Sequence, residues 1–121
     1  MVFTGSISPH LLPKYLRIAD VFVRPSRSEG LGSAFLEAMA AGLPVIGTRV
    51  GGIPDFLKDG ETGLFCKVDD PKSIVEKINL LTADKNLQNH IIQKGYKMVA
   101  TNYNWKKIAK EYQIVFESLI K

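Results

Sequence analysis

The chain has 121 residues, a length that fits one domain or a part of one and is small for an enzyme that holds two substrates. Hydrophobic residues make up 45% of it and charged residues 23%, which excludes a disordered chain, and 16 basic against 12 acidic side chains give a net charge of +4. No apolar run reaches the roughly 18 residues of a membrane span and no signal peptide opens the chain, so we expect a cytoplasmic protein.

The N-terminal part predicts two buried strands joined by a helix. Residues 2–4 form a short apolar run that ends at a glycine, which is typical of a buried strand. Ser8 and Pro9 offer an N-cap and a first helical residue, and apolar side chains then recur at helical spacing from 11 to 19. Residues 21–23 predict the second strand.

The central part predicts a loop, a very apolar helix and a third strand. The loop covers residues 26–32, the helix runs from about 33 to 41 and ends at Gly42, and the strand covers 44–48. Glu37 is the only charge between residues 30 and 48, so we expect a largely buried carboxylate. Burying an unpaired charge costs several kcal/mol or more, so Glu37 should accept hydrogen bonds from buried backbone or from a polar ligand.

The remaining part predicts a short helix at 55–57, a strand at 64–68 and three packing helices. The first of these helices starts at Asp70 and Pro71, and the second surrounds Ile91. The third carries an apolar stripe made of Trp105, Ile108, Ala109, Tyr112, Phe116 and Leu119. Strands that alternate with helices predict an α/β, Rossmann-like parallel sheet with flanking helices, and we treat residues 1–121 as a single domain.

A glycine-rich loop between a strand and a helix is the most informative segment. Gly30 and Gly32 let the backbone approach a ligand and leave free N–H groups at the helix N-terminus, an arrangement that binds phosphate but also occurs as a purely structural turn. Glu29 and Glu37, eight residues apart, favour a ligand with hydroxyl groups on either side of a diphosphate, because carboxylates accept hydrogen bonds from hydroxyls.

The C-terminal third of the chain is rich in lysine. From Lys85 onward seven lysines stand against two glutamates, which could attract anionic lipid at a membrane surface or nucleic acid. The lysines are dispersed and no aromatic stacking pattern accompanies them, which favours a solvated helix face, and we expect no nucleic acid partner. The single cysteine, Cys66, has no partner for a disulfide or a metal site and is expected to be a small core residue.

Essentially the whole chain resembles the C-terminal domain of retaining GT-B glycosyltransferases, the glycosyltransferase family 4 or group 1 type that serves in polysaccharide and lipopolysaccharide synthesis. The resembling segments are residues 19–23, Pro25-Ser26, Glu29 to Gly32, residues 37–46, Gly51 to Pro54 and residues 59–63. The resemblance implies a hexosyltransferase that takes its sugar from a nucleotide-sugar donor, such as a UDP- or GDP-sugar, without a metal or another cofactor.

The resemblance also implies roles for the site residues. Glu29 would be catalytic, beside the donor sugar near the reacting carbon. Gly30, Leu31, Gly32 and Ser33 would hold the diphosphate through their amides, and Glu37 would bind the ribose hydroxyls of the donor.

The chain departs from the family in several ways. It lacks the acceptor-binding domain and the first part of the donor domain, whose basic residues neutralise the diphosphate, so we expect the isolated chain to be inactive. Arg24 stands where the family more often has an apolar residue; it is either solvated or a partial replacement for the lost positive charge, and the same alternatives hold for Arg27.

Two consequences follow for partners and function. In the family's sheet order, 3-2-1-4-5-6, the strands at 2–4 and 21–23 resemble the third and fourth, so either they pair in a rearranged sheet or an open edge is left for self-association. The competing functional hypothesis is a non-catalytic fragment that binds a nucleotide sugar or a protein partner. A dinucleotide-dependent oxidoreductase is a distant third, because no G-x-G-x-x-G follows the first strand.

Overall fold

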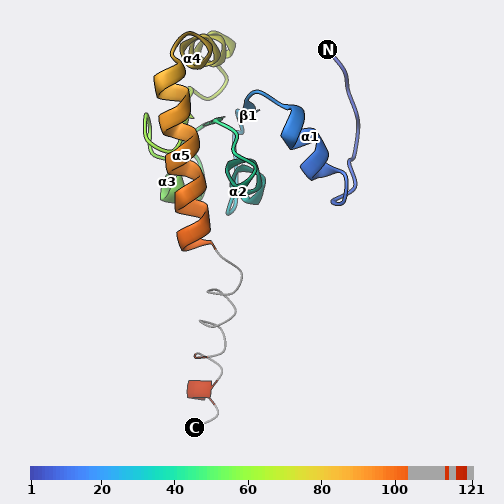
Figure 1. Cartoon of the computed structure of the whole chain (residues 1–121), viewed down its shortest axis with the longest axis vertical. Helices are drawn as coiled ribbons and strands as arrows, with labels where there is room; N and C mark the ends of the chain where they lie inside the picture. Colours follow the sequence, from blue (N-terminus) through green and yellow to red (C-terminus); the bar gives the residue numbers. More distant parts are fainter. Residues whose placement is uncertain (104–113, 115–116, 120–121) are drawn as a thin grey trace.

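Helices and strands alternate along the chain until two helices follow one another over residues 71–102 (Figure 1). The computed structural model describes residues 1–103, 114 and 117–119. The elements are α1 (Leu12–Ile18), β1 (Phe22–Arg24), α2 (Ser33–Ala40), β2 (Val45–Gly47), α3 (Ile53–Phe56), β3 (Leu64–Phe65), α4 (Pro71–Ala83) and α5 (Lys85–Asn102). The three strands form one parallel sheet in the order β1-β2-β3, which confirms the predicted α/β class.

Both faces of this sheet are covered, as parallel sheets require. Alternate residues of β2 divide between two core clusters: Val45 packs with Phe35 and Phe56 from α2 and α3, whereas Ile46 packs with Leu81 of α4. Helix α5 contributes to both clusters, because its first half packs in the cluster of α4 and its second half in that of α2 (Figure 1). The sheet therefore lies between two layers of helices.

Helix starts and stops mostly follow the predicted signals. Gly42 ends α2 with a φ of 80°, and its N–H donates to the carbonyl oxygen of Met39 at 3.1 Å. Asp70 caps α4 by accepting from the N–H of Ser73 at 3.2 Å. Cys66 is a buried core residue, as expected, and burial raises the pKa of its thiol.

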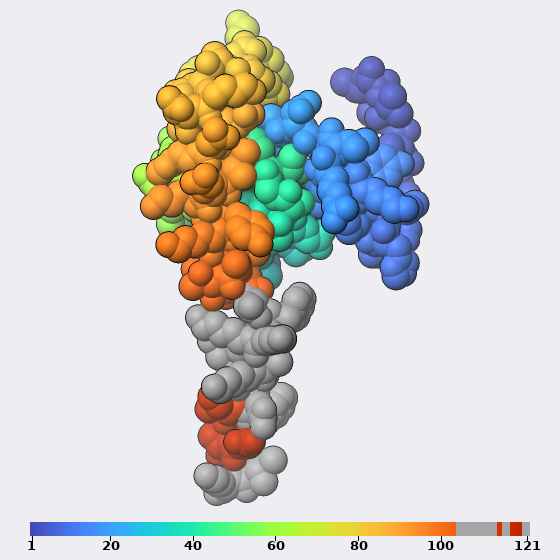
Figure 2. Space-filling view, in the orientation of Figure 1, coloured from blue at the N-terminus to red at the C-terminus, as the bar shows by residue number. Residues whose placement is uncertain are grey.

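The predicted strand at residues 2–4 is wrong. Val2 and Phe3 are 86% and 89% exposed, and the segment pairs with no strand among the described residues. Figure 2 shows this N-terminal segment standing apart from the rest of the chain, beyond α1. Of the two alternatives for this segment, pairing with the strand at 21–23 is therefore wrong: β1 pairs with β2, and its other edge is left open among the described residues. A strand needs a hydrogen-bonded neighbour, and residues 2–4 have none there.

The first helix also starts later than predicted. It begins at Leu12, and Pro13 occupies its first turn, whereas Ser8 and Pro9 lie in a preceding turn. In a helix that began at Pro9, the N–H of residue 13 would have to donate to residue 9. Proline has no N–H, so the helix can only begin where Pro13 falls in the first turn.

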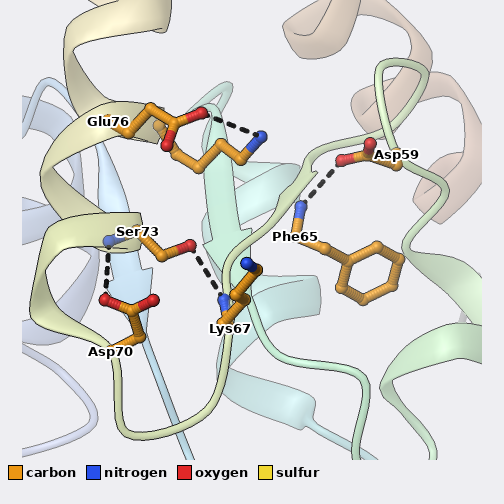
Figure 3. Close-up of polar contacts among 7 residues, drawn as sticks. Asp59, Phe65, Lys67, Asp70, Ser73 and Glu76 are labelled. Atoms are coloured by element: carbon orange, nitrogen blue, oxygen red, sulfur yellow. Dashed lines mark hydrogen bonds and ion pairs between the residues drawn. The ribbon is translucent and has the colours of Figure 1, made fainter.

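Side chains close the outer edge of the sheet at β3 (Figure 3). The N–H of Phe65 donates to Asp59 Oδ1 at 2.9 Å, and the N–H of Lys67 donates to Ser73 Oγ at 3.0 Å. These two amides alternate with that of Cys66, which donates to Gly47 of β2 at 2.8 Å. The edge of β3 that faces away from β2 is thus satisfied without another strand, whereas β1 has a strand on one side only in the part of the chain that the structure describes.

The last predicted helix falls largely outside the described residues. Of its apolar stripe, Trp105, Ile108, Ala109, Tyr112 and Phe116 are outside them, as are four of the C-terminal lysines. Peripheral membrane contact therefore stays a prediction. Over the part that the structure describes, no helix is both long and apolar enough to span a bilayer.

Candidate functional site

The candidate site forms where the chain leaves β1 and enters α2. Residues 25–32 connect the two elements, and Gly32, with a φ of 81°, turns the backbone into the helix. Ile53 and Phe56 of α3 lie against Gly32, which is buried, whereas Gly30, Leu31 and Ser33 are exposed. No side chain of the described residues caps the N-terminus of α2, so its first amides remain available to a ligand.

Two donors hold the Glu29 carboxylate. Arg24, the last residue of β1, brings its Nε within 2.6 Å of Glu29 Oε1, and Ser26 Oγ donates to the same oxygen at 2.7 Å. The Glu29 side chain is only 10% exposed, so the loop keeps this carboxylate largely out of solvent. The ion pair and the hydrogen bond offset the cost of that desolvation.

The loop after β2 holds the site loop through backbone contacts. Gly51, with a φ of 54°, lies so close to Glu29 that a Cβ on it would come within 1.7 Å of the Glu29 carbonyl oxygen. The N–H of Gly52 donates to the Gly30 carbonyl at 2.9 Å, and Thr48 Oγ1 donates to the Ser26 carbonyl at 2.5 Å. The site loop is therefore fixed from the neighbouring strand.

The expectation that Glu37 is buried is wrong. Its side chain is exposed on the face of α2 that also carries Ser33 and Ala40, and it forms no hydrogen bond or ion pair within the described residues. Helix α2 is packed on its other sides through Phe35, Leu36, Ala38 and Met39. One exposed stripe on an otherwise buried helix is enough to keep the carboxylate in water.

Glu37 lines a pocket of about 630 Å³ between α1 and α2, here called the α1–α2 pocket. Its walls are mostly apolar, and Arg17 is the only basic side chain among them. They consist of Ile7, Pro9, Leu12, Pro13, Leu16, Arg17, Glu37, Ala40 and Ala41. Neither Glu29 nor residues 30–33 line this pocket, so the two carboxylates flank the start of α2 without sharing a cavity.

Arg27, in the loop after β1, pairs with Asp69 and not with Glu29. Its Nε lies 2.6 Å from Asp69 Oδ1, and the hydrogen bond to Asp69 and its charge raise the pKa of the Arg27 guanidinium. Both side chains are mostly exposed. The solvated alternative therefore fits Arg27 better than it fits Arg24.

The ion pair between Arg24 and Glu29, supported by Ser26, is the feature of the site that sequence reasoning missed. The opposite charges stand five residues apart, at the end of β1 and in the loop that follows it, and that closeness in sequence was the available signal. Within the residues that the structure describes, no group of three or more potential ligands from His, Cys, Asp and Glu could hold a metal ion.

Comparison with known proteins places the chain among transferases. The family model described as "Glycosyl transferases group 1" matches residues 1–98. The chain is 39% identical to sulfoquinovosyl transferase SQD2 of Arabidopsis thaliana over 87% of its own length and 21% of that protein. It matches the structure of sucrose-phosphate synthase from Thermosynechococcus elongatus with a TM-score of 0.92 and 32% identity, over 98% of this chain and 30% of that one.

A more distant match supports the fold alone. HepE of Anabaena, solved in complex with UDP-glucose, has a TM-score of 0.84 at 19% identity, over 88% of this chain and 30% of its own. The chain spans only 21% to 32% of the length of the first curated relatives that it matches. The matches confirm the expected fold, and they leave the activity of a whole protein to inference.

Two glycines with positive φ provide a test of how the site loop is held. Gly51→Ala should destabilise the chain by more than Gly60→Ala, because Gly60 also has a positive φ, 76°, but nothing lies within 4 Å of a Cβ there. The strain of the left-handed backbone costs about 1–2 kcal/mol in both variants, and only Gly51→Ala adds a clash with the Glu29 carbonyl.

Urea denaturation of both variants measures the difference, and amide chemical shifts report on residues 26–30. Those shifts should move in Gly51→Ala and stay in place in Gly60→Ala. Equal losses of stability with unchanged loop shifts would contradict the backbone contact described above.

Proposed function

The chain belongs to the glycosyl transferases group 1 family, and we propose that it supplies part of the donor-binding domain of a retaining, nucleotide-sugar-dependent hexosyltransferase. The observation that carries the proposal is the loop after β1, in which a fixed carboxylate, Glu29, precedes an uncapped helix N-terminus. Residues 1–121 form a single partial domain in this proposal, and another domain provides the acceptor site.

The diphosphate of the donor binds at the start of α2. The amides of Gly30, Leu31, Gly32 and Ser33 hold it, because the N-terminus of a helix carries free N–H groups and a partial positive charge. The absence of a capping side chain and the exposure of most of these residues support this assignment. Neither a metal nor a cofactor is part of the proposal.

Glu37 binds the ribose hydroxyls. Its carboxylate is exposed, lies in the α1–α2 pocket and is not satisfied by any described side chain, so its oxygens remain available as acceptors. This is the ligand alternative of the two that the sequence left open. The α1–α2 pocket gives the nucleoside apolar walls.

Glu29 acts at the reacting carbon. In glycosyl transfer the bond from the anomeric carbon to the diphosphate breaks, and the diphosphate leaves with the electron pair. The acceptor hydroxyl forms the new bond to that carbon, and its proton passes to the departing diphosphate, which has gained the electron pair. Positive charge develops on the sugar ring between these events, and a fixed carboxylate nearby stabilises it without reorganisation.

Titration of the chain with nucleotides separates the competing functional classes. Calorimetry with UDP, UDP-glucose, GDP-mannose and NADH should show binding of a nucleotide diphosphate or its sugar and none of NADH; UDP-glucose is a rational first ligand because HepE, which shares the fold, was solved with it. The isolated chain should not transfer sugar to an added acceptor, because the acceptor site is not part of the proposed domain.

Tight binding of NADH would replace the proposal with a dinucleotide-binding function. Binding of a nucleotide sugar by a complete protein that never turns over would favour the non-catalytic fragment instead. Turnover by the isolated chain would contradict the assignment of a partial site.

Substitutions of Glu37 and of Glu29 should affect different steps, namely nucleotide binding and turnover. In a protein with the complete site, Glu37→Ala should weaken nucleotide affinity by about 2–3 kcal/mol, the order of charge-assisted hydrogen bonds, whereas Glu29→Gln should chiefly lower kcat. Glu76→Ala is the matched control, because Glu76 is an exposed helical carboxylate outside the α1–α2 pocket. Paired titrations and kinetics measure both effects, and a reversed pattern would mean that the two roles are exchanged.

We also propose that the isolated chain associates with a second copy through the open edge of β1 and the exposed apolar residues of the N-terminal segment. Sedimentation should then show a mass that rises with concentration. Phe3→Lys should weaken the association more than Tyr96→Lys, a control at an exposed aromatic residue of α5. A monomer at every concentration would show that the edge is protected in another way.

A further inference from the structure

Arg24 has no role in the function proposed above, yet its side chain contacts Glu29, the residue assigned to the reacting carbon. It is the last residue of β1, and its Nε lies 2.6 Å from Glu29 Oε1. Half of the Arg24 side chain is exposed, against 10% of that of Glu29. The arginine of the pair is therefore the more exposed to solvent, and the carboxylate is the more buried.

Both donors to Glu29 use the same oxygen. Ser26 Oγ and Arg24 Nε meet at Oε1, and Oε2 accepts no hydrogen bond within the described residues. Oε2 is nevertheless not a buried, unsatisfied atom, since the described part of the chain contains none. The carboxylate is thus held through Oε1, and Oε2 remains free to accept a hydrogen bond. Such an arrangement fixes the orientation of a side chain before a ligand binds.

The backbone that carries the two donors is itself held by hydrogen bonds. The N–H of Ser26 donates to the Arg24 carbonyl at 3.0 Å, and Thr48 Oγ1 binds the Ser26 carbonyl. The last residue of β1 and the residue that follows β2 thus hold the backbone at Ser26. By contrast, Arg27 pairs with Asp69 and is 80% exposed, so it does not contribute to holding Glu29.

We propose that Arg24 is a positioning residue for the Glu29 carboxylate. It fixes the orientation of this carboxylate and compensates its charge, so that an anionic diphosphate at the start of α2 does not meet a bare negative group. The proposal rests on the proposed function, since the task of Glu29 does. It attributes to Arg24 an effect that passes through Glu29, not a direct contact with the ligand.

The first test needs no ligand. In the full chain, the Nε–H of Arg24 should exchange slowly with solvent in a nitrogen-15 NMR experiment, because it is bonded to a carboxylate. Glu29→Gln should raise that exchange rate about tenfold or more, and Asp69→Asn, the matched control at the partner of Arg27, should leave it unchanged. An exchange rate for Arg24 that does not respond to Glu29→Gln would overturn the proposal.

The second test is a double-mutant cycle on binding of UDP-glucose at low ionic strength. Arg24→Met should weaken binding at least fivefold when Glu29 is present and less than twofold in a Glu29→Gln background. Arg24→Lys should recover most of the loss because it restores the charge. Arg27→Met should have little effect in either background.

The outcomes separate the two levels of inference. An equal loss for Arg24→Met in both backgrounds would show that Arg24 contacts the ligand itself, which overturns the positioning role and leaves the proposed function intact. If the unmodified chain binds neither UDP nor any nucleotide sugar, the proposed function fails, and the exchange experiment alone decides whether Arg24 holds Glu29.

Discussion

The close approach of two loop backbones is the constraint on which the site depends. Because β1 and β2 are parallel neighbours, the loops that follow them leave the sheet at the same end, and Gly51 and Gly52 let the second loop rest on Glu29 and Gly30. Any side chain at residue 51 would occupy the space of the Glu29 carbonyl. The position of Glu29 therefore follows from a contact that only glycine permits.

The sheet is closed at one edge and open at the other. At β3 the outward amides of Phe65 and Lys67 donate to Asp59 and Ser73, as Figure 3 shows, so an added strand would have to displace both side chains. At β1 no described strand or side chain plays that part. Any strand that extended this sheet would therefore meet an unprotected edge only at β1, the strand from which the site loop leaves.

Much of the fold could be predicted from the sequence because its signals are local. Gly42 ends α2 and Asp70 caps α4, and these features act within a few residues of themselves. The prediction of a strand at residues 2–4 was wrong because strand pairing depends on partners that are distant in the sequence. The prediction that Glu37 is buried was wrong because composition gives the polarity of a segment but not which side of a helix faces water. The closeness of Arg24 and Glu29 in the sequence was a signal, but the pair went unpredicted because spacing does not give the path of the loop, which decides whether the two side chains meet.

Glu29 and Glu37, which the sequence spacing does not distinguish, differ in solvent exposure and in hydrogen bonding. Glu29 is largely desolvated, and Arg24 and Ser26 already satisfy one of its oxygens, so a ligand finds it oriented and compensated. Glu37 is exposed to water, where its charge needs no partner, and in the proposed function it exchanges that water for ribose hydroxyl groups in the α1–α2 pocket. A group that acts on a developing charge benefits from being fixed beforehand, whereas a group that only binds can be recruited from solvent. The asymmetry between the two environments is therefore a physical reason to assign them different roles.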